Sequence, residues 1–313
     1  MEQERIKIGI VQEKPVYLDL KASLQKAAEI TTQAASQGAQ LVVFGETWFS
    51  GYPAWIDYLP NIALWDHKPT QEVFYQMMEN AIEVPGPATD FLSNLARDLG
   101  VILVAGVNER TKKGRAQGTL YNSILIFSAD GTLEVHHRKL MPTYTEKLLY
   151  GSGDAHGLKS IETPFGKLGA LICWEHWMPL ARQTMHEEGE TLHLALWPAV
   201  KDLHQLASRQ YAFEGQCFVV AVGQVLQVKD LPSVLELPES LASDPEQYLL
   251  NGGSAVIAPD SSYILEPQFD KEGLLLVEID QLKRVVFGRL ALDVTGHYYR
   301  PDLFDFNVNK KRL

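Results

Sequence analysis

Cysteine is scarce in this sequence, since only Cys173 and Cys217 occur among its 313 residues. Both lie in apolar segments, and two cysteines match neither the disulfide framework of a small secreted protein nor the ligand spacing of a zinc site. We therefore predict a reducing, cytoplasmic location for the protein.

The sequence also lacks long hydrophobic runs and an excess of basic residues. Its longest apolar runs are about half as long as a membrane-spanning helix requires, and the amino-terminal stretch MEQERIKIGI contains no apolar signal region. With 28 Lys and Arg against 39 Asp and Glu, the net charge is -11, whereas nucleic-acid binding depends on basic residues that neutralise phosphates. We expect neither a membrane nor a nucleic acid as partner.

Strand and helix patterns alternate along the chain. Over residues 6–46 a strand is followed by a helix, whose apolar stripe includes Leu20 and Leu24, and then by a second strand. Two strand pairs, at 120–140 and 160–173, are joined by short turns and predict hairpins. Strands that occur partly in hairpins and partly in β-α units predict mixed sheets with helices outside, in one α/β domain.

Two segments in the second half of the chain lead to more specific expectations. Leu203, Leu206, Ala207 and Tyr211 have helical spacing, which predicts that this stripe faces the core. Residues 228–250 contain three prolines and several acids, which predicts a long surface excursion. Such a segment in a compact domain is usually a lid, a contact surface or a flexible loop.

Three apolar strands end at residues that could carry chemistry: Glu46, Lys139 and Cys173. Taken singly, each has an ordinary explanation, because a strand cysteine is most often a core residue and a charged strand end is most often solvated. A cysteine nucleophile, however, needs a base that takes its proton, and a lysine can stabilise negative charge on a substrate. Since ligands bind outside the carboxyl ends of strands, we predict that these three side chains meet at one sheet edge.

The segments around these residues resemble the Glu-Lys-Cys motifs of the nitrilase, or carbon-nitrogen hydrolase, superfamily. The segments are FGETWFSGYP, HRKLMPTYTEKLLYGSGD and LICWEHWMPLAR, and the resemblance extends from KIGIVQ to about residue 306. Cys-Trp-Glu and DVTGHYYRPDLF are similar to the nitrilase branch. The resemblance implies a four-layer α-β-β-α sandwich with residues 1–313 as a single domain. It further implies a core at about 5–280 and a tail at 281–313 in subunit contacts of a homodimer or higher homo-oligomer.

The resemblance also implies an activity, namely hydrolysis of an organic nitrile to a carboxylic acid and ammonia through a covalent thioimidate and thioester. Cys173 would be the nucleophile, Glu46 the base, and Lys139 the group that stabilises developing charge. Glu146 matches the second glutamate of the family, which helps to position the lysine and the substrate. No cofactor is implied. An amidase and a cyanide-converting enzyme would use the same residues, and an inactive scaffold would keep only the fold, so these alternatives stay open.

The remaining candidates receive simpler interpretations. Tyr52 and Trp174 lie next to the motifs, and we predict that they line an apolar substrate pocket. We interpret Cys217 as core packing. His136 and His137 are adjacent on a strand and so point to opposite faces, and no histidine has a recognisable metal-ligand spacing. We therefore predict no metal site.

Overall fold

The fold is built on two mixed β-sheets, which the computed structural model describes over residues 5–279 and 283–312. Within these residues each sheet has seven strands. The first sheet has the order β14-β1-β2-β4-β5-β6, with β3 beside β4, and its strands are β1 (Ile6–Gln12), β2 (Leu41–Phe44), β3 (Ile82–Glu83), β4 (Ile102–Arg110), β5 (Leu120–Phe127), β6 (Leu133–Arg138) and β14 (Gly273–Ile279). The second has the order β11-β12-β10-β9-β8-β7, with β13 beside β12, and its strands are β7 (Ile161–Thr163), β8 (Gly166–Ile172), β9 (Leu192–Leu196), β10 (Phe218–Val222), β11 (Val225–Gln227), β12 (Tyr248–Ile257) and β13 (Tyr263–Phe269).

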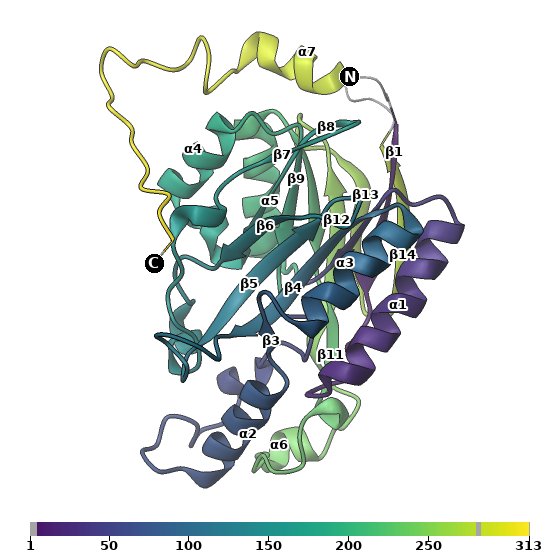
Figure 1. Cartoon of the computed structure of the whole chain (residues 1–313), viewed down its shortest axis with the longest axis vertical. Coiled ribbons are helices and arrows are strands. Elements are labelled where there is room, and N and C mark those ends of the chain that lie inside the picture. Colours follow the sequence, from purple (N-terminus) through teal and green to yellow (C-terminus); the bar gives the residue numbers. More distant parts are fainter. Residues whose placement is uncertain (1–4, 280–282, 313) are drawn as a thin grey trace.

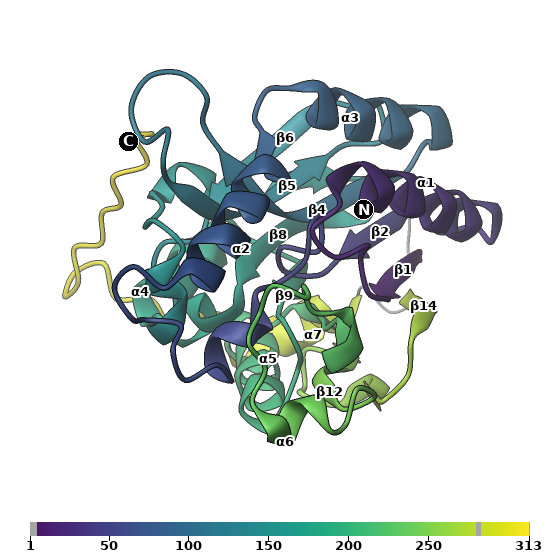
Figure 2. The ribbon, with the colours of Figure 1, turned by 90° about the horizontal axis from the view of Figure 1, so that it is seen from below.

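Helices cover the outer faces of both sheets (Figure 1). The α-helices are α1 (Leu20–Ser36), α2 (Lys68–Glu79), α3 (Pro87–Leu99), α4 (Pro179–Glu187), α5 (Asp202–Gly215), α6 (Glu239–Ala242) and α7 (Lys283–Ala291). The pair α1 and α3 packs on the first sheet, and α5 packs on the second with α4 near it (Figure 2). The two sheets face each other in the middle, so the molecule is the four-layer α-β-β-α sandwich that the resemblance implied.

The alternation of side chains along the strands explains the layers. In β2, Leu41 and Val43 belong to the core between the sheets, whereas Val42 and Phe44 belong to the core under α1 and α3. Successive side chains of a strand point to opposite faces. Because both faces of the central strands are covered, every residue of β2 is apolar and buried, as the continuous apolar run LVVF indicates.

Most predicted elements are confirmed, including the α1 helix and the two hairpins, β5–β6 and β7–β8, both antiparallel. The apolar stripe predicted for α5 is wrong in part. Ala207 and Tyr211 are buried, but Leu203 and Leu206 are 58% and 56% exposed. The buried side of α5 instead includes Gln205, whose amide donates to two backbone carbonyls. Apolar periodicity could not identify a buried face that contains a hydrogen-bonded polar side chain.

The segment at 228–250 is ordered and packs over one end of the sandwich. It contains a 3-10 turn (Val228–Asp230) and α6, and β12 begins within it at Tyr248. Apolar side chains of this segment pack against Trp55 and Tyr52, which lie after β2; they are Leu231, Leu235, Leu237 and Leu241. The segment expected to be a surface excursion therefore packs close to Tyr52, one of the predicted pocket residues.

The carboxyl-terminal segment returns to the body of its own chain (Figure 1). Lys310 Nζ lies 2.6 Å from Glu188 Oε1, and Arg312 Nη1 lies 3.2 Å from Asp154 Oδ1. Residues 281, 282 and 313 of the predicted subunit-contact tail lie outside the described residues. No helix in the described ranges is both long and apolar enough to cross a membrane.

Candidate active site

The three residues singled out at strand ends come together, but they come from both sheets. Glu46 follows β2 and Lys139 directly follows β6, both in the first sheet, while Cys173 directly follows β8 in the second. The expectation of one sheet edge is therefore wrong for Cys173. The reason is that two facing sheets bring strand ends together across the space between them, and strand patterns do not show which strands share a sheet.

Lys139 lies between two carboxylates in this space. Its Nζ is 2.8 Å from Glu46 Oε1 and 2.7 Å from Glu146 Oε2. One ligand atom each of Glu46, Glu146 and Cys173 lies within 4.8 Å of the others, and all four side chains are buried. The structure thus adds Glu146 to the same cluster. Lys139 therefore contacts both carboxylates, and the Cys173 sulfur lies within 4.8 Å of an oxygen of each, out of bulk water.

Two amides that the sequence analysis did not select hold Glu46 in place. Asn122 Nδ2 donates to Glu46 Oε1 at 2.6 Å, and Gln224 Nε2 donates to the Glu46 backbone carbonyl at 2.6 Å. The second carboxylate oxygen, Oε2, accepts no hydrogen bond from any described residue. This oxygen is therefore free to accept the proton of a nearby thiol. Asn122 lies on a strand that the sequence does predict, and a polar residue inside an apolar strand was the one available indication.

Burial and mutual charge set the proton affinities of the cluster. Burial, assisted by Glu146 and opposed by Lys139, raises the pKa of Glu46 to about 7. Burial disfavours the Lys139 ammonium, but the charges of Cys173, Glu46 and Glu146 outweigh it and raise the pKa of Lys139 well above its ordinary value. Burial and the charge of Glu46 raise the pKa of Cys173, which Lys139 and the backbone N–H of Trp174 oppose. The resting cysteine is therefore a thiol that needs a base. Glu46, with a pKa near neutral pH, can serve as that base.

Cys173 is buried, lines a cavity described below, and lies at a strained turn. It has φ +50° and begins a 3-10 turn (Cys173–Trp177) directly after the extended residue Ile172. A positive φ is unfavourable for a residue with a Cβ and persists only where surrounding structure holds it. A strand that stops at such a turn presents its first turn residue to the space beyond the sheet, as other nucleophiles at strand-to-helix turns are presented.

Glu175 ties this turn to the lysine. Its Oε2 accepts from the backbone N–H of Ile172, and its Oε1 accepts from that of Leu140, both at 2.7 Å. His137 Nε2 lies 2.9 Å from the same carboxylate. Burial disfavours the carboxylate, but His137 and the two backbone donors outweigh it and lower the pKa of Glu175. One ionised side chain therefore fixes the residue before Cys173 relative to the residue after Lys139.

We expect the Glu175→Gln substitution to lower the free energy of unfolding by about 2 kcal/mol, because an amide has one acceptor oxygen and leaves a buried backbone N–H without a partner. Urea denaturation measures the change. The exposed acid Glu162 on β7 provides the control, and Glu162→Gln should alter stability by less than about 0.5 kcal/mol. Equal effects of the two substitutions would contradict the bridging role of Glu175.

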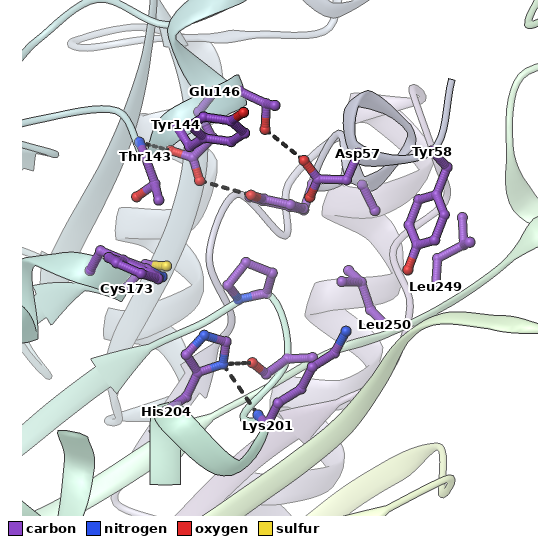
Figure 3. A pocket seen from close by; sticks show the side chains of 16 residues that line it. Asp57, Tyr58, Thr143, Tyr144, Glu146, Cys173, Lys201, His204, Leu249 and Leu250 are labelled. Atoms are coloured by element: carbon purple, nitrogen blue, oxygen red, sulfur yellow. Dashed lines mark hydrogen bonds between the residues drawn. The ribbon is translucent and has the colours of Figure 1, made fainter. Parts of the chain in front are cut away.

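A cavity of about 250 Å³ opens onto the cluster. Cys173 and Glu146 lie at one end of it, and Tyr58 and Leu249 lie at the other (Figure 3). Tyr52 and Trp174 both line it; Tyr52 donates to Glu146 Oε1 at 2.8 Å, and Trp174 is 46% exposed. Its other lining residues are mixed in character and include Ala54, Asp57, Thr143, Tyr144, Thr145, Pro198, Ala199, Lys201, His204 and Leu250.

The ligand atoms of Glu46, Glu146 and Cys173 are close enough together to surround a metal ion. The Lys139 ammonium, however, already lies within 2.9 Å of both carboxylates and supplies a positive charge there. A second cation would have to displace it or be repelled by it. His136 and His137 pair with different acids, Glu109 and Glu175, in keeping with side chains on opposite faces of β6. Cys217 is buried in the hydrophobic core.

Comparisons with known proteins agree with this fold and show the family. The model of the carbon-nitrogen hydrolase family matches residues 7–285. An aliphatic nitrilase of Sinorhizobium fredii is 35% identical over 309 residues, covering 98% of this chain and 96% of that one. A bifunctional nitrilase/nitrile hydratase of Nicotiana tabacum is 35% identical over 305 residues, covering 97% and 86%. A carbon-nitrogen hydrolase of Helicobacter pylori superposes with a TM-score of 0.70 at 24% identity, covering 95% and 96%. The chain is an enzyme that belongs to the nitrilase branch of the carbon-nitrogen hydrolase family.

Proposed function

We propose that this enzyme hydrolyses an organic nitrile to a carboxylic acid and ammonia, with Cys173 as nucleophile. The observation that carries the proposal is the buried contact of Lys139 with Glu46 and Glu146 beside Cys173. The relatives named as nitrilases cover nearly the whole chain, which supports the choice of a nitrile over other carbon-nitrogen compounds.

The first half of the reaction forms the covalent bond. Glu46 takes the thiol proton through its free oxygen Oε2, and the Cys173 sulfur attacks the nitrile carbon. The nitrile nitrogen gains the electron pair of the broken π bond and then a proton, which gives a thioimidate. Lys139 and the backbone N–H of Trp174 face the charge that develops, and one such donor is worth about 3 kcal/mol in related reactions.

The second half consumes two water molecules. Glu46 takes a proton from the first water, which adds to the thioimidate carbon and gives a tetrahedral species. Its nitrogen leaves as ammonia, and a thioester remains. The second water, deprotonated by the same carboxylate, hydrolyses the thioester, releases the acid and restores the thiol. Because Glu46 both accepts and returns protons, a pKa of about 7 suits its role.

Glu146 and Tyr52 have supporting roles in this proposal. The Glu146 carboxylate holds the Lys139 ammonium by two contacts of 2.9 and 2.7 Å, and Tyr52 fixes that carboxylate from the cavity side. Tyr52 and Trp174 would contact the organic part of the substrate. A cavity of about 250 Å³ fits a small nitrile at its reactive end.

A substrate panel tests the proposal. The enzyme is incubated with an aliphatic nitrile, an aromatic nitrile, the matching amides and cyanide, and ammonia, acid and amide are each measured. We expect ammonia and acid in equal amounts from at least one nitrile, with a higher kcat/KM than for its amide. A higher kcat/KM for the amides would instead assign an amidase, and turnover of cyanide alone would assign a cyanide-converting enzyme.

We also propose that the chain works as a homodimer or higher homo-oligomer in the cytoplasm. Apolar side chains exposed on α4, α5 and α7 support association; they include Leu180, Leu203, Leu206, Phe287 and Leu290. The unpaired state of both cysteines is compatible with a reducing compartment. The proposal also includes a single domain over residues 1–313 and subunit contacts made by the tail at 281–313.

A further inference from the structure

A series of buried hydrogen bonds starts at the Cys173 carbonyl and includes no residue that lines the cavity. His176 Nδ1 is 2.7 Å from the Cys173 carbonyl oxygen, and His176 Nε2 is 3.0 Å from His193 Nε2. His193 Nδ1 is in turn 2.8 Å from Glu190 Oε1, and Tyr211 donates to Glu190 Oε2 at 2.6 Å. All of these side chains are buried.

The surroundings fix the positions of these groups. Trp197 stacks on the His176 ring with centroids 4.9 Å apart, and Tyr211 stacks on the His193 ring at 3.8 Å. On β8, a Cβ at Gly169 would lie 1.5 Å from Glu190 Oε1, so this glycine leaves the space that the carboxyl group occupies. The chain of contacts is therefore a packed feature with little room for other arrangements.

The number of protons in this chain follows from its chemistry. A carbonyl oxygen can only accept, so the hydrogen of the first link is on His176 Nδ1, and a neutral His176 then has a lone pair on Nε2. His193 Nε2 must carry the hydrogen of the second link, which leaves a lone pair on a neutral His193 Nδ1. Glu190 must then donate the hydrogen of the third link. Three links need three hydrogens, and two neutral imidazoles supply only two.

We propose that Glu190, His193 and His176 form a support for the Cys173 main chain that depends on one exchangeable proton held at Glu190. Glu190 is thus a positioning residue, which acts on the nucleophile through two histidines. When that proton is lost, one of the three links becomes a contact between two acceptors, whichever tautomers the rings adopt. Either the Cys173 carbonyl then loses its hydrogen-bond donor, or one of the two links farther from Cys173 is lost. In both cases the strained φ of +50° at Cys173 is held less firmly.

The surroundings favour the uncharged forms of Glu190, His193 and His176 near neutral pH. Burial raises the pKa of Glu190 to about 8, although the Tyr211 hydroxyl opposes this. Burial and the neighbouring His193 lower the pKa of His176 to about 3, and burial and His186 lower that of His193 well below its ordinary value. Other titratable or charged groups face this chain from α4, α5, α7, the turn after β8 and nearby loops; they are Glu175, Arg182, His186, Glu188, Tyr211, Glu214, Cys217 and Arg289.

The Glu190→Gln variant can keep the hydrogen bond to His193 but has no carboxyl proton to lose. Its amide can donate to His193 Nδ1 and accept from Tyr211, so the three links stay intact at every pH. The measurement is the rate of Cys173 alkylation by iodoacetamide between pH 6 and 9, followed by mass spectrometry of the Cys173 peptide. Because both proteins share the rise in thiolate with pH, the ratio of the variant rate to the wild-type rate reports the support alone.

We expect this ratio, normalised to its value at pH 6, to rise with a midpoint near pH 8. The rise should be about fivefold, the factor that corresponds to the loss of one hydrogen bond. A flat ratio would overturn the proposal. The assay needs no nitrile, so it remains valid even if the proposed function, on which the choice of Cys173 as reacting group rests, is wrong.

Thermal unfolding and a second variant provide independent readouts. Because the folded protein holds the Glu190 proton more tightly than the unfolded chain, the wild type should lose Tm relative to the glutamine variant as the pH rises from about 5 to 8. Tyr211→Phe removes a donor to the Glu190 carboxylate and should move the alkylation midpoint to higher pH. A Tm difference that changes with pH while the alkylation ratio stays flat would show that Glu190 ionises without affecting Cys173, and would also overturn the proposal.

Discussion

Replacing Cys173 by alanine is expected to lower kcat for nitrile hydrolysis by about 10⁴-fold or more, since the covalent route needs the sulfur. The fold should persist, because the substitution removes one buried atom and alanine is small. We expect a change in the free energy of unfolding of about 1 kcal/mol. Ammonia release from the best nitrile of the substrate panel measures the first effect, and urea denaturation measures the second.

Cys217 provides a matched control for this experiment. It is also a buried, unpaired cysteine, but the charged groups that act on its thiol are Glu190, Arg289 and Glu214, and not Lys139 or Glu46. Cys217→Ala should lose a similar amount of stability and keep its turnover. Ammonia release by the Cys173→Ala protein at the wild-type rate would show that the proposed mechanism is wrong, whatever the control does.

The Glu46→Gln substitution is expected to reduce kcat/KM by about 10²- to 10⁴-fold, the range typical for removal of a general base. Glutamine can still accept the Lys139 hydrogen bond but cannot take the thiol proton. In the wild type, kcat/KM should fall as the pH drops below about 7, where Glu46 becomes protonated. Residual activity of the variant should lack this fall. If the variant showed the same fall in kcat/KM below about pH 7 as the wild type, another group would be the base.

Although Glu46→Gln should lower activity, it should not lower the stability of the folded protein at pH 8. The pKa of Glu46 is raised in the folded protein to about 7 from an ordinary 4.5, so its favourable contribution is complete below about pH 4.5 and is lost as the pH rises to about 7. Removing the carboxyl group should therefore leave the variant at least as stable as the wild type at pH 8. Such a trade between activity and stability is common for catalytic groups in buried sites.

Glu109 provides a control with the reverse sign. Burial disfavours its carboxylate, but hydrogen bonds and charge from His136 and Arg138 outweigh this and lower its pKa to about 2. Its stabilising contribution is present above about pH 4.5 and is lost as the pH falls toward 2. Glu109→Gln should therefore lower Tm at pH 8, whereas Glu46→Gln should not. Thermal unfolding of both variants at pH 5 and pH 8 distinguishes the two cases.

The local features of the molecule could be predicted from the sequence. Apolar runs such as LVVF and LGALIC identified buried strands, and the residues at which such strands end are three side chains that the structure brings together. Tyr52 and Trp174, chosen for their position beside the motifs, both line the cavity, and their contact with a substrate stays a prediction. These conclusions depend on short-range patterns, which are set by backbone geometry and by the preference of apolar residues for the interior.

Contacts across the sandwich could not be predicted in this way. The sequence did not show that Cys173 comes from the other sheet, that Asn122 and Gln224 hold Glu46, or that Glu175 joins the two strand ends. The exposed leucines of α5 were misplaced because a polar residue, Gln205, lies on its buried face.

The sequence by itself determined which residues could react, in what order the strands and helices occur, and which family the chain resembles. Only the tertiary structure decided how close those residues lie, which of them are neutral, and what holds the strained turn at Cys173. The physical reason is that proton affinity depends on burial and on charges a few ångströms away. Those neighbours come from segments that are far apart in the chain and meet only when the two sheets pack.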